Sequence, residues 1–181
     1  WRSQGMDYSY DDLTRLAGDA EPFRSLIEPD DPAFLPPGDM PSRIREFCHR
    51  TGQPVPETVG QVMRTVYESL ALKYRLALER LTMLSGHSFE RLHIIGGGTK
   101  NHLLCQMSAD ALGRTVIAGP VEATALGNAI VQLIALGEIG DVGQAREILS
   151  RSVETVSYQP TASAQWEEAY GRFQALVRVS I

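Results

Sequence analysis

The stretch Leu92–Asn128 constrains the fold of this chain more than any other (LHIIGGGTKNHLLCQMSADALGRTVIAGPVEATALGN). Its pattern predicts a strand, a triple-glycine turn, a helix, a second strand, a turn and a further helix. Gly96, Gly97 and Gly98 remove every Cβ where the chain leaves the first strand, so a ligand can approach the main chain. The helix start beside that turn offers unpaired N–H groups. The pattern therefore predicts a place to hold phosphate or a nucleotide.

The alternation of helix and strand predicts an α/β domain, rich in helix, with a partial parallel sheet. We expect strands at 91–95 and 115–118, each followed by a helix, at 101–112 and 123–136. Two parallel strands leave both edges of a sheet unpaired, so we expect further strands outside this chain. A long helix precedes the first strand and ends at Gly86, because apolar residues recur at every third or fourth position: Val62, Val66, Leu70, Tyr74, Ala77, Leu81 and Leu84.

Residues 1–58 differ in character from residues 59–181. The first segment is rich in Pro and Asp, as in EPDDPAFLPPGDMP, which predicts an irregular segment packed on the following domain. Short helices are expected at 10–17 and 41–51, the second with Ile44 and Phe47 or Cys48 on one apolar side. Near the other end, a helix places core residues on one face: Trp166, Tyr170, Phe173 and Val177.

Composition narrows the classes of partner. The chain of 181 residues has a net charge of -5 and 17 scattered Lys and Arg residues, which argues against a nucleic-acid surface. No apolar run is long enough to predict a membrane helix. Cys48 and Cys105 lack a metal or disulfide spacing, which is typical of a reducing compartment, so we expect a cytoplasmic protein. The start, WRSQGMDYSYDDL, has no initiator Met, and we expect functional residues upstream of Trp1.

The glycine turn taken alone leaves a structural alternative open, in which glycines only let the chain pass close to a packed neighbour. The turn is not a P-loop, because GxxxxGK[ST] is absent. It also departs from a dinucleotide-binding fingerprint, since Asn101 stands where GxGxxG requires its last glycine. Thr99 or Asn101 is expected to cap the following helix.

With its neighbours, the turn resembles the adenosine-binding part of the FGGY family of carbohydrate kinases, within the actin-like, ribonuclease H-like ATPase superfamily. The resemblance extends from about Phe23 to Tyr158 and includes IEPDDPAF, TGQPVP and ESLALKYRLALERL. Within the family, this chain is similar above all to the L-rhamnulose kinase branch. Members of the family transfer the γ-phosphoryl group of MgATP to a sugar hydroxyl. The resemblance implies that residues 59–181 form the latter part of the C-terminal nucleotide-binding domain.

The resemblance also implies the residues of the ATP site. Gly96, Gly97, Gly98 and Asn101 match the GGGxxN motif, in which glycine backbone lies against ribose and α-phosphate and the Asn amide contacts adenine or ribose. Supporting positions are implied in the next helix and in the GPVEATALGN turn, expected beside the adenosine turn: Gln106, Asp110, Glu122, Thr124 and Asn128. For Glu122 and Thr124, an ordinary helix start is the alternative.

The catalytic base, the sugar-binding residues and most Mg²⁺ contacts of such a kinase are implied to lie before Trp1, in an absent N-terminal domain. We therefore expect no catalytic residue in this chain and no kinase activity from the chain alone. The full-length protein is expected to bind ATP and a ketose. A second hypothesis is a non-catalytic nucleotide-binding or scaffold module of the same superfamily.

Other reactive residues favour structural roles. The four His residues show no i, i+4 spacing, so no metal site is predicted. His93, in an apolar strand, is expected in the core, and Cys105 is expected to fill core space. The acidic groups are expected to serve as caps, turns or solvated surface: Asp7, Asp11, Asp12, Asp30 and Asp31.

Overall fold

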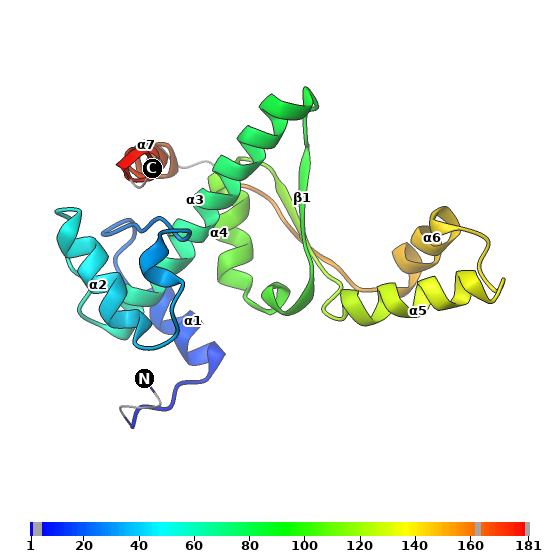
Figure 1. The fold of residues 1–181 in the computed structure, drawn as a ribbon, viewed down its shortest axis with the longest axis horizontal. Helices are drawn as coiled ribbons and strands as arrows, with labels where there is room; N and C mark the ends of the chain where they lie inside the picture. The colour runs from blue at the N-terminus through cyan, green and yellow to red at the C-terminus, as the bar shows by residue number, and fades with distance from the viewer. Residues whose placement is uncertain (2–4, 162–163, 180–181) are drawn as a thin grey trace.

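In the computed structural model, which describes residues 1, 5–161 and 164–179, the helices Val59–Ser85 and His102–Leu112 lie beside a small sheet (Figure 1). The α-helices are α1 (Tyr10–Asp19), α2 (Met40–Arg50), α3 (Val59–Ser85), α4 (His102–Leu112), α5 (Ala123–Ala135), α6 (Val142–Ser152) and α7 (Ala164–Val179). The strands are β1 (Arg91–Ile94), β2 (Thr115–Ala118) and β3 (Val156–Tyr158), and two 3-10 turns are η2 (Pro32–Phe34) and η3 (Gly96–Lys100). Helices α5 and α6 form a hairpin that extends away from the rest of the structure.

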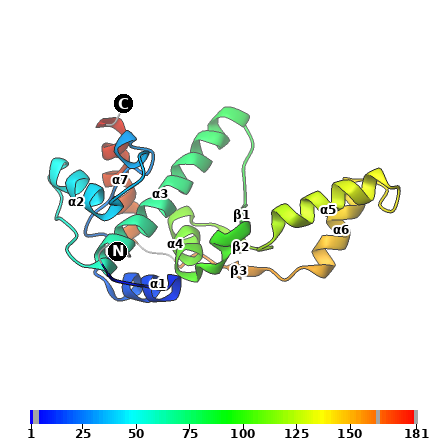
Figure 2. The same ribbon diagram turned by 60° about the horizontal axis from the view of Figure 1, so that its bottom comes forward.

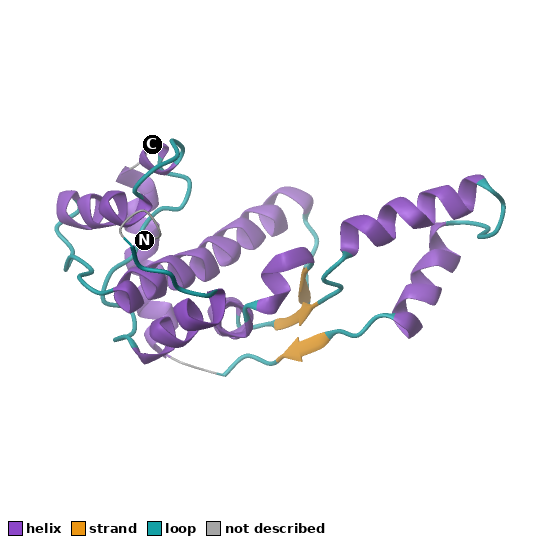
Figure 3. Ribbon diagram, turned by 90° about the horizontal axis from the view of Figure 1, so that it is seen from below, coloured by secondary structure: helices purple, strands orange, loops and turns teal. Residues whose placement is uncertain are grey.

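The sheet contains three strands in the order β1-β2-β3 (Figure 3). Strands β1 and β2 are parallel, with Arg91 opposite Thr115 and Ile94 opposite Ala118, which confirms the predicted pair. Strand β3 is antiparallel to β2, with Ala118 opposite Val156, so the sheet is mixed. Strand β3 is not predicted from the sequence, because three residues are too few to show an alternating pattern.

Helix α3 is the longest element, and its ends follow from its sequence. Thr58 and Gln61 form a capping box at its start, and Gly86 ends it in a left-handed conformation with φ 69°. The predicted span is therefore confirmed. The predicted apolar face is only partly buried: Val62 lies in the core, whereas Leu84 is 86% exposed. Ala71 and Leu72, which are not on the predicted face, are fully buried. The last turns of α3 extend beyond the helices that cover its first half (Figure 1).

The main core lies where α3, α4 and α7 meet. Leu72, Met107 and Phe173 are buried there together, and Trp166 and Tyr170 of α7 join them, as predicted. Cys105 is also fully buried, which confirms its expected role as core filling. A second cluster joins α2 to α3 through Ile27, Ile44, Phe47, Cys48 and Val62.

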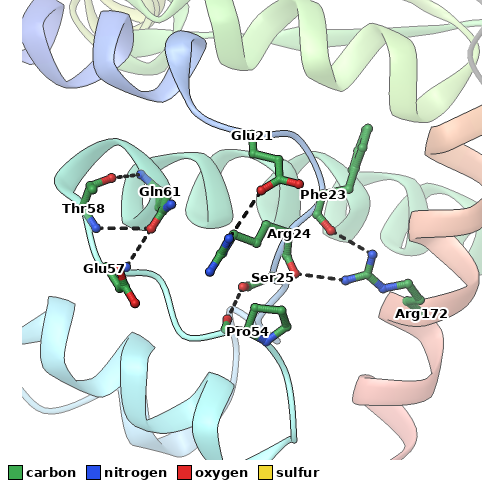
Figure 4. Close-up of polar contacts among 9 residues, drawn as sticks. All are labelled: Glu21, Phe23, Arg24, Ser25, Pro54, Glu57, Thr58, Gln61 and Arg172. Atoms are coloured by element: carbon green, nitrogen blue, oxygen red, sulfur yellow. Dashed lines mark hydrogen bonds and ion pairs between the residues drawn. The ribbon is translucent and has the colours of Figure 1, made fainter.

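The segment between α1 and η2 crosses α3 and is fixed by polar contacts. The backbone N–H of Ile27 donates to Ser69 Oγ at 2.9 Å. Figure 4 shows Ser25 donating to the Pro54 carbonyl and Arg172 of α7 donating to the Phe23 carbonyl, the latter at 2.8 Å. Hydrogen bonds of this kind, of which the one from Ile27 to Ser69 is buried, keep an irregular segment in one position.

His93 corrects one sequence expectation. It is exposed rather than buried, because alternate residues of β1 face a side of the sheet that no described element covers.

Two of the acidic residues do serve as caps: Asp12 at the start of α1 and Asp31 at η2. Among the described residues, no helix is long and apolar enough to span a membrane. In the same residues, no group of His, Cys, Asp and Glu side chains is arranged to hold a metal ion.

Candidate functional site

The triple-glycine turn forms η3, directly after β1. Gly96 has φ +77°, a left-handed conformation that favours glycine, and Thr99 Oγ1 donates to the Gly96 carbonyl at 2.7 Å. A Cβ added at Gly97 would meet no atom within 4 Å, and one at Gly98 would make ordinary contact with Ile94 at 3.8 Å. Within the described chain, close packing against a neighbour therefore does not explain Gly97. Its backbone instead faces open space.

Asn101 joins this turn to helix α4. Its side-chain oxygen accepts from the Leu104 N–H at 3.0 Å, which confirms the predicted N-cap. The amide oxygen is thereby occupied, while the amide nitrogen donates to no group in the described part of the chain. Asn101 is thus a donor next to the glycine turn, and it can contact an acceptor on a base or ribose.

The two turns at the ends of β1 and β2 lie side by side. The Gly119 N–H donates to the Ile94 carbonyl at 2.9 Å, and the Gly96 N–H donates to the Pro120 carbonyl at 3.0 Å. Gly119 has φ +130°, and a Cβ there would lie 2.8 Å from the Glu154 carbonyl oxygen. Only glycine fits at that position. The structure therefore brings the GPVEATALGN turn against the glycine turn, as expected from the resemblance.

A hollow of about 670 Å³ opens beside the glycine turn. One side consists of Gly97, Lys100 and Asn101, and α1 and α3 supply the other residues: Tyr10, Asp11, Thr14 and Tyr67. Figure 2 shows α1 running next to the start of α4. The contribution of α1 was not anticipated, because no local pattern relates residue 10 to residue 97.

Helix α1 is held in place by close contact with α3. A Cβ added at Gly60 would lie 2.4 Å from the Leu16 carbonyl oxygen, so the two backbones touch. Arg64 Nη1 donates to the carbonyls of Ala17 at 3.2 Å and Gly18 at 3.0 Å. These contacts fix the wall that α1 contributes to the hollow.

Glu68 holds the Arg64 side chain in position through an ion pair. Its carboxylate accepts from Arg64 Nε at 2.8 Å and from the Phe23 N–H at 2.9 Å, and the side chain is 1% exposed. Burial raises the pKa of Glu68, while the hydrogen bond and charge of Arg64 oppose that rise. The Arg64–Glu68 pair therefore connects α1, α3 and the segment at Phe23.

The supporting residues occupy other positions. Gln106 donates to Asp110 at 2.9 Å and to the Gln159 carbonyl at 2.9 Å, and Asp110 also accepts from the Thr161 N–H at 2.8 Å. This pair ties α4 to the chain after β3 and does not line the hollow.

The residues implied in the second turn are exposed and also lie outside the lining. Glu122 is at the N-cap position of α5 but makes no side-chain capping bond, and Thr124 and Asn128 face outward from the helix. Their place next to the glycine turn comes from the backbone contacts of Gly96 and Gly119.

A larger hollow, of about 790 Å³, lies on the other side of α1 against the start of α3. The charged residues of its lining are mainly acidic, with Asp7, Asp12, Asp19 and Glu21 against the single Arg15. Like charges disfavour a polyphosphate there. The hollow beside the glycine turn is therefore the candidate site.

Comparisons with known proteins show which family the chain is similar to. Residues 1–136 match the family model described as the FGGY family of carbohydrate kinases, C-terminal domain. A rhamnulokinase from Bacteroides thetaiotaomicron is 51% identical over 172 residues, and one from Enterococcus faecalis is 41% identical over 181 residues. These alignments cover 95% and 99% of this chain but only 36% of each relative, so the chain spans about a third of their length.

Solved structures show the same fold. A xylulose kinase from Rhodospirillum rubrum has a TM-score of 0.64 at 24% identity, covering 94% of this chain and 34% of that chain. A Plasmodium falciparum glycerol kinase, crystallised with ADP, has a TM-score of 0.68 at 14% identity, covering 99% and 35%. They show that this chain has the fold of about a third of each of these two kinases, which confirms the expected α/β class. The chain therefore belongs to the FGGY family of carbohydrate kinases, whose C-terminal domain its residues 1–136 match.

Proposed function

We propose that this chain holds the adenosine side of ATP in a sugar kinase. The observation that carries the proposal is the combination of an open backbone at Gly97 with the unused amide donor of Asn101, on one side of a hollow of about 670 Å³. Glycine backbone accepts the approach of a ribose or α-phosphate, and the first turn of α4 favours the negative charge. The chain's residues for ATP are Gly96, Gly97, Gly98 and Asn101.

The proposed reaction is transfer of the γ-phosphoryl group of ATP to L-rhamnulose, giving L-rhamnulose 1-phosphate and ADP. Support comes from two relatives named rhamnulokinase that align with nearly the whole chain, and from a structural neighbour crystallised with ADP. Such transfer depends on Mg²⁺ to neutralise the phosphates and on a base for the sugar hydroxyl. In the described residues, no group of His, Cys, Asp and Glu side chains is arranged to hold a metal ion. We assign the base and most contacts to Mg²⁺ to the rest of the protein, as the family resemblance implies.

The remaining two thirds of the kinase is the proposed partner of this chain. Helix α5 supports this assignment, because its sequence is strongly apolar and yet none of its described residues is buried. Val131 and Leu133 of α5 are 67% and 38% exposed, and Leu136, which follows the helix, is 75% exposed. A helix with such a surface is normally covered by another part of a protein. We further place residues 1–58 as a segment packed on domain 59–181, and the protein in the cytoplasm.

The test is ADP release by the full-length protein with MgATP and a panel of ketoses. We expect release that depends on L-rhamnulose, and none from the 181-residue chain alone. The matched variants are Asn101→Ala, which removes the donor and the N-cap, and Asn101→Asp, which keeps the cap but loses the donor. Both are expected to raise the KM for ATP. Sugar-dependent ADP release by the isolated chain would refute the division of labour. If ATP raises the melting temperature of the full-length protein and none of the ketoses does, the scaffold alternative is favoured instead.

A further inference from the structure

Tyr10, the first residue of α1, is the aromatic group least covered by the described chain around the candidate site. It is 87% exposed, and its ring pairs with no other described residue, although it lines the hollow together with Gly97 and Asn101. Large aromatic side chains are usually buried or in contact, because they contribute the most apolar surface. An aromatic ring that stays exposed beside a glycine turn is therefore unusual.

The backbone that carries Tyr10 is fixed. Ser9 and Asp12 form a capping box, in which the Asp12 N–H donates to Ser9 Oγ at 3.1 Å and the Ser9 N–H donates to Asp12 at 3.1 Å. The contacts of Gly60 and Arg64 described above hold the other end of the helix. The ring thus projects from a rigid helix start, which limits the entropy lost when a ligand orders it.

The other groups on this wall are hydrogen-bond acceptors. The Thr14 hydroxyl donates its proton to the Tyr10 carbonyl at 2.9 Å, so its oxygen is left to accept, and Asp11 adds a carboxylate. On the opposite side, Lys100 and Asn101 are donors. A ligand with an amine-bearing flat end and an anionic end matches this polarity in one direction only, with the amine toward α1.

We propose that Tyr10 stacks on the adenine base of the bound nucleotide and that α1 forms the base-recognising wall of the site. Adenine is flat, has an exocyclic amine for the acceptors of α1, and fits between an aromatic face and a glycine backbone that lacks side chains. Tyr10 is then a positioning residue that sets nucleotide affinity and the preference for a purine base. This inference rests on the proposed function.

The experiment uses the full-length protein with Tyr10→Ala and Tyr10→Phe. Aromatic stacking on one base changes affinity by about 5-fold to more than 100-fold on removal of the ring. For a single exposed ring we expect Tyr10→Ala to raise the KM for ATP about tenfold. The kcat and the KM for the sugar are expected to stay unchanged. Tyr10→Phe, which keeps the ring, is expected to stay within about twofold of the wild type.

Base preference gives a readout that a purely structural role of Tyr10 does not change. Because a purine offers more stacking area than a pyrimidine, the ratio of kcat/KM for ATP over CTP is expected to fall in Tyr10→Ala and to be kept in Tyr10→Phe. Leu84→Ala is the control, since it removes a side chain with equal exposure, 86%, from the far end of α3. It is expected to change neither ratio nor KM.

Two failures are distinguishable. If the wild-type protein releases ADP with a sugar but Tyr10→Ala keeps the wild-type KM for ATP and the wild-type base preference, the inference about Tyr10 is overturned and the kinase function stands. If the wild type releases no ADP with any ketose, the proposed function fails, and titration calorimetry with ADP then decides about Tyr10. Equal ADP affinity of wild type and Tyr10→Ala, or no affinity in either, overturns the stacking proposal.

Discussion

Replacing Gly60 with Ala tests how α1 is positioned. The added Cβ would lie 2.4 Å from the Leu16 carbonyl oxygen and 3.0 Å from its carbon, and both are backbone atoms that cannot rotate away. Ordinary contact begins at 3.4 Å, so α1 must move away by about 1 Å. That movement stretches the Arg64 bonds to Ala17 and Gly18, now 3.2 and 3.0 Å, beyond hydrogen-bonding distance.

The magnitude follows from three contributions. Overpacking of this kind costs about 1–3 kcal/mol, and each weakened bond from a charged donor adds up to about 1.5 kcal/mol. Ala stabilises a helix relative to Gly by about 1 kcal/mol, which offsets part of the cost. We expect the free energy of local opening of α1 to fall by about 2 kcal/mol, which corresponds to about thirtyfold faster amide exchange.

The assay is hydrogen exchange with mass spectrometry on the full-length protein, read in peptides that cover α1. Gly171→Ala is the matched control, because Gly171 also lies in a helix but an added Cβ there would meet no atom within 4 Å. That variant is expected to be stabilised by about 1 kcal/mol. Unchanged or slower exchange of α1 in Gly60→Ala would refute the close-contact argument and the rigidity assigned to the wall.

Three further results are expected. Arg64→Met leaves Glu68 buried without its cation and should destabilise the protein by about 3 kcal/mol at neutral pH, as measured by denaturant unfolding. Since the folded pKa of Glu68 is raised, this loss should grow as pH rises above about 4.5, and Arg64→Met with Glu68→Gln should remove that dependence. Burial, and after it the carboxylate of Glu79, raises the pKa of Tyr170 to about 12. The contribution of Tyr170 to stability is therefore present at neutral pH and is lost as pH rises from about 10 through 12. Alkaline difference spectra of the wild type and Tyr170→Phe should show one phenol that ionises only at this high pH. Cys48 and Cys105 are fully buried, and burial raises the pKa of Cys48 to about 11. A thiol reagent at about pH 8 should therefore label both cysteines only after denaturation. Rapid labelling of the native protein would contradict the burial of these two side chains in the core.

The sequence was most informative where local rules decide the structure. The bounds of α3 follow from Thr58, Gln61 and Gly86, and the parallel pair follows from two apolar strands joined through a helix. Asn101 as a cap likewise needs only its neighbours. These features depend on interactions within a few residues, so a sequence pattern can predict them.

Predictions that depended on what covers a surface were less successful. His93 was expected in the core and is exposed, and Leu84 lies on an apolar pattern without a partner in the described chain. Periodicity shows which residues share a face, but it does not show whether another element covers that face. Strand β3 was missed for a related reason, because its identity depends on pairing with β2 rather than on its own three residues.

The sequence by itself determined the family, the order of the elements from α3 to α5, and the glycine turn with Asn101, because these are matters of local chemistry and ordered motifs. Only the tertiary structure decided that Gly97 faces open space and that α1 forms the opposite wall of its hollow. It also decided that Gln106 and Asp110 hold the chain after β3 and do not line the hollow. Residues 10 and 97 line the same hollow because α1 packs on α3, and the two helices can touch because Gly60 has no side chain. No local pattern encodes this packing, since it depends on the shapes of two helices distant in the chain.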